Sequence, residues 1–163
     1  MGALKHVGGL LKATRVSQRL AIGGEHLLIA GVLGGELRFD GGLEVPGSSS
    51  PSVVALPMSD AAAVDPEEAF VASLAACHML WFLHVACDAG FLPESYDDAA
   101  EGIMTKNERG MLRISQITLR PLIIWSGDKQ PTSTEVDHLH HLAHEQCFIA
   151  NSIKTDVIVK PRN

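Results

Sequence analysis

The chain has 163 residues, of which 46% are hydrophobic and 20% are charged, and its formal net charge at pH 7 is −6. This length supports one domain with a hydrophobic core, and the negative charge argues against nucleic acid or an anionic membrane as a partner. The three cysteines, Cys77, Cys87 and Cys147, are too few for a disulfide scaffold and favour a reducing compartment. We therefore expect a cytoplasmic protein, and the N-terminal residues show no secretion signal.

The first third of the chain carries weak patterns. Residues 1–24 are Gly-rich and predict an N-terminal tail, loose over 1–9, followed by an irregular segment, whereas residues 25–163 are expected to form a single domain. Residues 25–40 mix apolar residues with turn signals at the Gly pairs 23–24 and 34–35 and predict short strands joined by turns. Residues 46–63 are rich in Ser, Pro and Ala and predict a long loop.

A first helix is predicted to begin sharply. Asp65 suits the N-cap, Pro66 suits the first helical position, and Glu68 completes a capping box. The helix should end near Gly90. Because residues 69–86 contain no Asp, Glu, Lys or Arg, we expect other elements, of one chain or of two, to bury this helix on all sides. A membrane span is the alternative, but the apolar run is borderline in length, and a buried central helix explains it better.

An antiparallel hairpin is predicted after this helix. The segments 96–106 and 111–125 flank a turn that contains Gly110, and the second segment alternates in polarity from Leu112 onward. Both features are typical of paired strands.

A second helix and a last strand complete the chain. Thr132 suits an N-cap, with Glu135 three residues later, and the helix should run to about Asn151. Residues 154–160 alternate and predict a final strand. The order of strands, helix, strands, helix and strand favours an α+β fold with antiparallel sheet over a doubly wound fold.

Two segments carry a cysteine within a recognisable motif. The first is Asp65-Pro-Glu-Glu followed by Leu74-Ala-Ala-Cys-His, and the second is Ala143-His-Glu-Gln-Cys-Phe-Ile-Ala-Asn-Ser. Together, with a hairpin between them, they resemble the OsmC/Ohr family of thiol-dependent peroxidases over residues 36–160. The resemblance implies an α+β fold with two long central helices, an intertwined homodimer, and reduction of organic hydroperoxides.

The resemblance also implies roles for single residues. Cys77 would be the peroxidatic thiol, Cys147 the resolving thiol, and Glu67 the carboxylate beside the site. The family uses an arginine from the N-terminal strand region, for which Arg38 is the nearest candidate. We expect no cofactor and no metal; the expected partners are a second copy of the chain, an organic hydroperoxide and a dithiol reductant.

The spacing of Glu67 and Cys77 adds a geometric constraint. A peroxidatic cysteine must be a thiolate, which apolar burial opposes and a nearby cation favours. An arginine held by Glu67 would supply that cation. On one continuous helix the two residues lie about 15 Å apart along the axis. Glu67 can serve the same site as Cys77 only if it comes from a second subunit, which predicts an active site at a dimer interface.

Other interpretations of the same residues remain open. A cysteine in an Ala-rich helix is often a small core residue, and Cys87 is predicted to be a core or surface thiol without a catalytic role. The chain could instead bind a small apolar ligand without peroxidase activity. Four histidines precede Cys147, and His140, His144 and Cys147 would share one helical stripe that suits zinc or copper. A solvated polar helix face is the simpler interpretation of that cluster, and one histidine could also tune Cys147 electrostatically.

Overall fold

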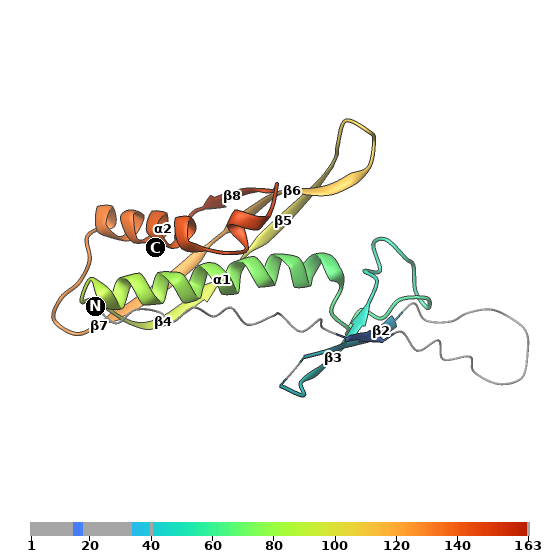
Figure 1. Cartoon of the computed structure of the whole chain (residues 1–163), viewed down its shortest axis with the longest axis horizontal. Coiled ribbons are helices and arrows are strands. Elements are labelled where there is room, and N and C mark those ends of the chain that lie inside the picture. The colour runs from blue at the N-terminus through green and yellow to red at the C-terminus, as the bar shows by residue number, and fades with distance from the viewer. Residues whose placement is uncertain (1–14, 18–33, 40, 163) are drawn as a thin grey trace, which may run out of the picture. The chain divides into compact units, whose positions relative to one another are not determined.

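The computed structural model describes residues 15–17, 34–39 and 41–162, so the predicted loose tail at 1–9 lies outside the described residues. The chain divides into two compact units, residues 1–66 and 67–163, and each is described by itself. Strands, a helix, four strands, a second helix and a last strand follow one another in the predicted order (Figure 1). The prediction of a single domain over 25–163 stays a prediction.

The first unit contains a small antiparallel sheet in the order β1-β2-β3. Its strands are β1 (Arg15–Ser17), β2 (Gly34–Arg38) and β3 (Glu44–Ser48). Strand β1 falls within the segment that was predicted to be tail and irregular chain, so that part of the prediction is wrong. Strand β3 also extends into the predicted loop at 46–63, since Gly35 pairs with Gly47 and Glu36 with Pro46. The rest of that loop forms turns, as predicted.

Helix α1 (Pro66–Asp88) begins at the predicted proline. It ends because Gly90 adopts a φ of 78°, while the amide of Gly90 donates to the carbonyl of Cys87 and the amide of Phe91 donates to the carbonyl of Ala86. These two bonds form a Schellman motif, in which a residue with positive φ is normally glycine. The predicted cap by Asp65 and Glu68 stays a prediction.

Only one face of α1 is buried. Leu74, His78, Phe82 and Ala86 recur every four residues and are all buried, whereas Leu80 on another face is 64% exposed. The single chain therefore buries only one face of α1, and burial of the other faces by a second chain stays a prediction. Among the described residues, α1 is long and apolar enough to cross a membrane by length and composition, a test that core helices of soluble proteins also pass.

Four strands follow α1 instead of two. They are β4 (Leu92–Asp98), β5 (Glu101–Lys106), β6 (Leu112–Leu119) and β7 (Pro121–Ser126). The predicted hairpin is confirmed for β5 and β6, and β4 pairs with β7, both antiparallel. Each predicted long strand is interrupted where the Asp98 carboxylate accepts from the Arg120 amide at 2.6 Å, because a backbone amide bonded to a side chain leaves the strand ladder.

The last strand, β8 (Asp156–Val159), pairs with β6 in parallel, with Gln116 opposite Asp156. The other strand pairs of the described sheets are antiparallel, as predicted, and this pair is the exception. The chain leaves β6, passes through β7 and α2 and returns in the same direction, and a crossover that contains a helix permits parallel pairing.

Helix α2 (Ser133–Gln146) carries the predicted capping box. The Thr132 hydroxyl accepts from the Glu135 amide at 3.3 Å, and the Glu135 carboxylate accepts from the Thr132 amide at 2.8 Å. The helix ends five residues before the predicted end at Asn151. The Asn151 side-chain amide donates to the carbonyls of Glu145 and Cys147, which satisfies acceptors that another helical turn would otherwise occupy. A short 3-10 helix, Ala150–Ser152, follows.

Two buried clusters form the core of the second unit, and helix α2 lies beside α1 in one of them (Figure 1). The first cluster contains Phe82, Ala86, Phe91, Leu139 and Ala143, and the second contains Leu74, Ile117, Leu119 and Cys147. Trp81 packs against both clusters. Strand β5 crosses α1 so closely that a Cβ on Gly102 would lie 2.8 Å from Cγ2 of Val71, so this position requires glycine.

The capping box at Thr132 generates a stability prediction. Thr132→Ala removes the hydroxyl that accepts from the Glu135 amide, and we expect the free energy of unfolding to fall by about 1 kcal/mol. Urea denaturation followed by circular dichroism measures this loss. Ser133→Ala, at the neighbouring exposed position, is the matched control and should change stability far less. Equal effects of the two substitutions would contradict a capping role for Thr132.

Candidate active site

The two motif cysteines meet in the core of the second unit. Cys77 is half-buried on α1, and Cys147, which is fully buried, forms the C-cap of α2. Both pack in the cluster around Leu74 and Ile117. Cys147 is a buried member of this cluster, Cys77 packs against the cluster, and both cysteines are free thiols. The structure therefore brings together the two sulfur atoms that the sequence placed 70 residues apart.

The surroundings of Cys147 keep it protonated. Burial, followed by the hydrogen bond with Cys77, raises the pKa of Cys147 to about 11. The Ala150 amide donates to the Cys147 sulfur at 3.4 Å and acts in the opposite direction, since a donor favours the thiolate. Burial outweighs this donor, so at neutral pH Cys147 is a thiol whose S–H can point toward the neighbouring sulfur.

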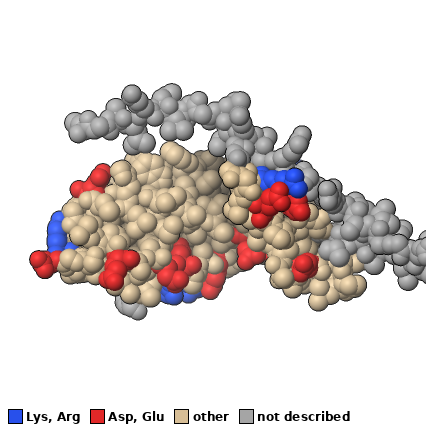
Figure 2. Space-filling view, turned by 90° about the horizontal axis from the view of Figure 1, so that it is seen from below, with Lys and Arg blue, Asp and Glu red and all other residues tan. Residues whose placement is uncertain are grey.

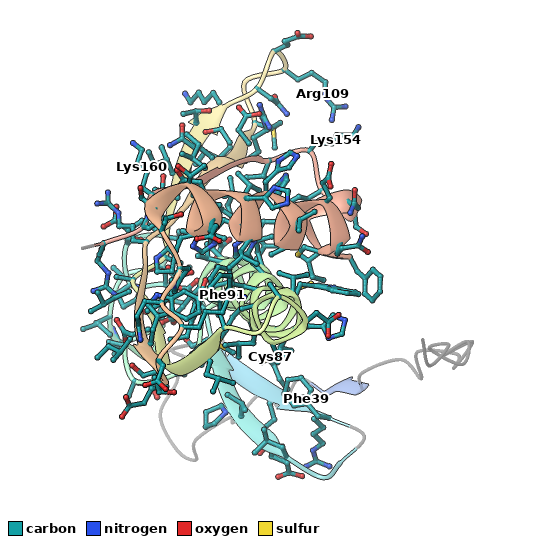
Figure 3. The ribbon with its side chains drawn as sticks, turned by 90° about the vertical axis from the view of Figure 1, so that its left-hand side faces the viewer. Phe39, Cys87, Phe91, Arg109, Lys154 and Lys160 are labelled. Atoms are coloured by element: carbon teal, nitrogen blue, oxygen red, sulfur yellow. The ribbon has the colours of Figure 1, made fainter. Side chains whose placement is uncertain are left out.

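Glu67 lies at the start of α1, and the structure does not bring it to Cys77 within the chain. Helix α1 is continuous from Pro66 to Asp88, so the distance along its axis stays at about 15 Å. Cys87 is exposed near the C-terminus of the same helix, as predicted for a surface thiol, and Figure 3 shows it with Phe91 at the end of α1 nearest the viewer.

Arg38 lies at the end of β2, in the first unit. Its guanidinium contacts the carboxylate of Glu36 at 2.8 Å and that of Glu44 at 3.1 Å. The hydrogen bond to Glu36 and the charge of Glu44 raise the pKa of Arg38. Its contribution to an active site stays a prediction.

A buried histidine pair was not predicted. His78 and His140 are each at most 4% exposed, and Nε2 of His78 lies 3.1 Å from Nδ1 of His140. The rings stack at a centroid distance of 5.3 Å, and His140 also stacks on Phe82 at 4.2 Å. His78 shares the four-residue spacing of the buried face of α1, which is a signal in the sequence, but nothing in the sequence identifies its partner.

The metal stripe that the sequence left open as an alternative is not formed. His140 is turned toward His78, and Cys147 lies beyond the end of α2 with extended backbone (ψ 111°) and its side chain in the core. Within residues 15–17, 34–39 and 41–162, no group of three or more His, Cys, Asp or Glu side chains is arranged to hold a metal ion. The helical spacing failed as a predictor because α2 stops before Cys147.

Aromatic side chains lie beside the two thiols. Trp81 is one helical turn after Cys77 on the same face of α1, and Phe148 directly follows Cys147. Their rings meet edge to face at 5.6 Å, and Phe148 is 70% exposed. The immediate surroundings of the sulfur pair are therefore apolar and partly open. On the face seen in Figure 2, Lys and Arg side chains are scattered singly among Asp and Glu and form no basic patch.

Comparison with known proteins shows the family of the chain. The family model described as OsmC-like protein matches residues 59–162, which contain both cysteines. The chain belongs to the OsmC-like protein family. The solved structure of an OsmC-like protein of unknown function from Vibrio cholerae is 46% identical, with a TM-score of 0.80, and the match covers 82% of this chain and 86% of that one.

More distant OsmC-like relatives share the fold. The organic hydroperoxide resistance protein OhrB of Bacillus subtilis is 22% identical over 94% of this chain and its own whole length, with a TM-score of 0.65. An organic hydroperoxide resistance protein OsmC from Legionella pneumophila is 22% identical over 93% of this chain and 96% of its own, with a TM-score of 0.64. None of the curated proteins matches the chain.

The histidine pair generates a pH prediction for stability. Burial lowers the pKa of His78 to about 3 and that of His140 to about 4, below the value near 6.5 of an unfolded chain. Between these values the unfolded state binds more protons, so the free energy of unfolding should fall as the pH decreases from about 7 to about 4. Urea denaturation at successive pH values measures this slope.

His140→Phe tests the origin of this slope. The variant keeps a ring on Phe82 but removes one titrating group, so its slope should be shallower by up to about 1.4 kcal/mol per pH unit. Leu139→Ala, a neighbouring buried substitution without a titrating group, should lower stability and leave the slope unchanged. A wild-type slope in His140→Phe would contradict the assignment.

Proposed function

We propose that the protein is a cysteine-based peroxidase that reduces organic hydroperoxides, with Cys77 as the peroxidatic and Cys147 as the resolving thiol. The observation that carries the proposal is that the half-buried Cys77 and the fully buried Cys147, both free thiols, pack in one cluster. Membership of the OsmC-like family supports it. A pair of free thiols in contact is suited to a two-electron oxidation that ends in a disulfide.

The proposed reaction has three balanced steps. The Cys77 thiolate attacks the terminal oxygen of the hydroperoxide, the O–O bond breaks, and the alkoxide takes a proton and leaves as an alcohol. Cys77 is now a sulfenic acid, and the Cys147 sulfur attacks it, with loss of water and formation of a disulfide. A dithiol reductant then reduces the disulfide by exchange and is itself oxidised.

The difference in burial suits the two roles. Cys77 is reachable from solvent, whereas Cys147 is protected, and its raised pKa keeps it a thiol at neutral pH. Trp81 and the exposed ring of Phe148 provide apolar surface next to the sulfur pair, which fits the organic part of the substrate and leaves a small polar peroxide with fewer contacts.

The proposal includes a homodimer in the reducing cytoplasm. Glu67 lies too far along α1 to serve Cys77 of its own chain, so a second copy must supply it, together with an arginine for which Arg38 is the candidate. The exposed side of α1 supports such an assembly, because Leu80 presents apolar surface there. An uncovered apolar helix face is typical of an interface.

Cysteine variants test the mechanism. Cys77→Ser removes the nucleophile, so consumption of cumene hydroperoxide in the presence of dithiothreitol should fall by at least about a hundredfold. Cys147→Ser should complete the first step only, which leaves a sulfenic acid on Cys77 that dimedone traps and mass spectrometry detects. Cys87→Ser is the matched control and should keep wild-type turnover. Unchanged turnover in Cys77→Ser would refute the proposal.

Light scattering tests the assembly. The wild-type protein should have twice the mass of the chain, and Leu80→Glu should shift it toward the monomer and lower peroxidase turnover, because a buried charge without a partner destabilises an interface. Leu92→Glu adds the same charge at a comparably exposed leucine (54%) on β4 and serves as the control. A wild-type monomer with full turnover would contradict the shared active site.

A further inference from the structure

A cavity of about 240 Å³ lies between α2 and the end of the chain, and neither cysteine lines it. Its α2 wall consists of Asp137, His140, His141 and His144, which follow one another at intervals of three, one and three residues on one face of the helix. Val157 and Val159 of β8 form the opposite wall. The cavity is therefore distinct from the sulfur pair and independent of the proposed peroxidase activity.

One wall of the cavity is apolar. Val157 and Val159 are two residues apart, so both side chains stand on the same face of β8, and Pro161 continues this surface. The cavity has room for a molecule of roughly eight non-hydrogen atoms, if each takes about the 30 Å³ that a water molecule occupies in the liquid. A ring or a short branched chain fits this wall.

The α2 wall is polar and carries three imidazoles. Among the described residues no Lys or Arg lines the cavity, and Asp137 contributes a carboxylate. Glu145 pairs with His141 at 3.4 Å, which adds a second carboxylate next to a lining residue. Imidazole nitrogens accept hydrogen bonds when they carry no proton. A wall of carboxylate and imidazole groups favours a cation that can donate hydrogen bonds.

His140 joins this wall to the core. It is only 4% exposed, its Nδ1 is engaged with His78, and its Nε2 has no hydrogen-bond partner among the described residues. A buried polar atom without a partner costs free energy. The bond to His78 holds the imidazole in place, so the α2 wall of the cavity is rigid at this point.

We propose that the cavity binds a small primary amine in its protonated form. The apolar part of the ligand packs on Val157 and Val159, and the ammonium group pairs with Asp137 and donates to an imidazole nitrogen of α2 that carries no proton. A metal ion is a poorer occupant, because no three metal-ligating side chains converge within the described residues. A neutral molecule of the same size lacks the ion pair, and an anion lies beside the Asp137 carboxylate.

Three probes of equal shape test the charge requirement. Benzylammonium, benzyl alcohol and benzoate are titrated separately into the full-length protein and followed by calorimetry and by the imidazole signals in NMR spectra. We expect saturable binding of benzylammonium with shifts of the His140 and His144 signals, weaker binding of benzyl alcohol, and none of benzoate. Equal binding of all three probes, or no saturable binding of benzylammonium, would overturn the proposal.

Asp137→Asn identifies the anchor. This variant should bind benzylammonium about fivefold more weakly and leave the affinity for benzyl alcohol unchanged, because one partly exposed ion pair contributes at most about 1 kcal/mol. Asp128→Asn removes the same charge from a residue outside the cavity lining and is the matched control. Equal loss in both variants would mean that net charge, and not this cavity, attracts the amine, and would also overturn the proposal.

Discussion

The packing of α2 against the buried face of α1 is the contact on which the rest of the second unit depends. Phe82 and Ala86 of α1 meet Leu139 and Ala143 of α2 in one cluster, and the bond between His78 and His140 lies within the same contact. Burial of apolar surface supplies most of the stabilisation. The hydrogen bond between the two imidazoles fixes the position of one helix relative to the other, because a buried hydrogen bond is directional.

The chemistry of the sulfur pair follows from where α2 ends. Because the helix stops at Gln146, the backbone of Cys147 is extended and its side chain points into the core beside Cys77. One more helical turn would have placed Cys147 on the same stripe as His140 and His144. The Asn151 side chain accepts the role of the next helical turn by donating to the carbonyls of Glu145 and Cys147. The helix therefore ends there, and Cys147 packs near Cys77 instead of lying in line with His140 and His144. The cavity beside α2 is lined by His140 and His144 but not by Cys147.

The two faces of α1 have different consequences. The buried face holds the core and one of the two thiols, and its spacing of four residues is regular from Leu74 to Ala86. The other face leaves Leu80 exposed and is the surface that the proposed second subunit covers. Because α1 is continuous, Glu67 lies far from Cys77 of the same chain. The proposed catalysis by these two residues therefore depends on assembly with a second subunit.

The sequence by itself determined the local elements and the family. Some features depend only on neighbours within a few residues, so the sequence predicts them directly. They are the start of α1 at Pro66, the capping box of Thr132 and Glu135, the hairpin of β5 and β6, and the two cysteine motifs. Only the tertiary structure decided the partners of these elements. Other features depend on contacts between residues far apart in the sequence. They are the pairing of His78 with His140, the parallel pairing of β8 with β6, the division of the predicted long strands and the inward orientation of Cys147. These contacts form because burial and hydrogen bonding lower the free energy of the whole core. No single segment of the sequence encodes that gain in free energy.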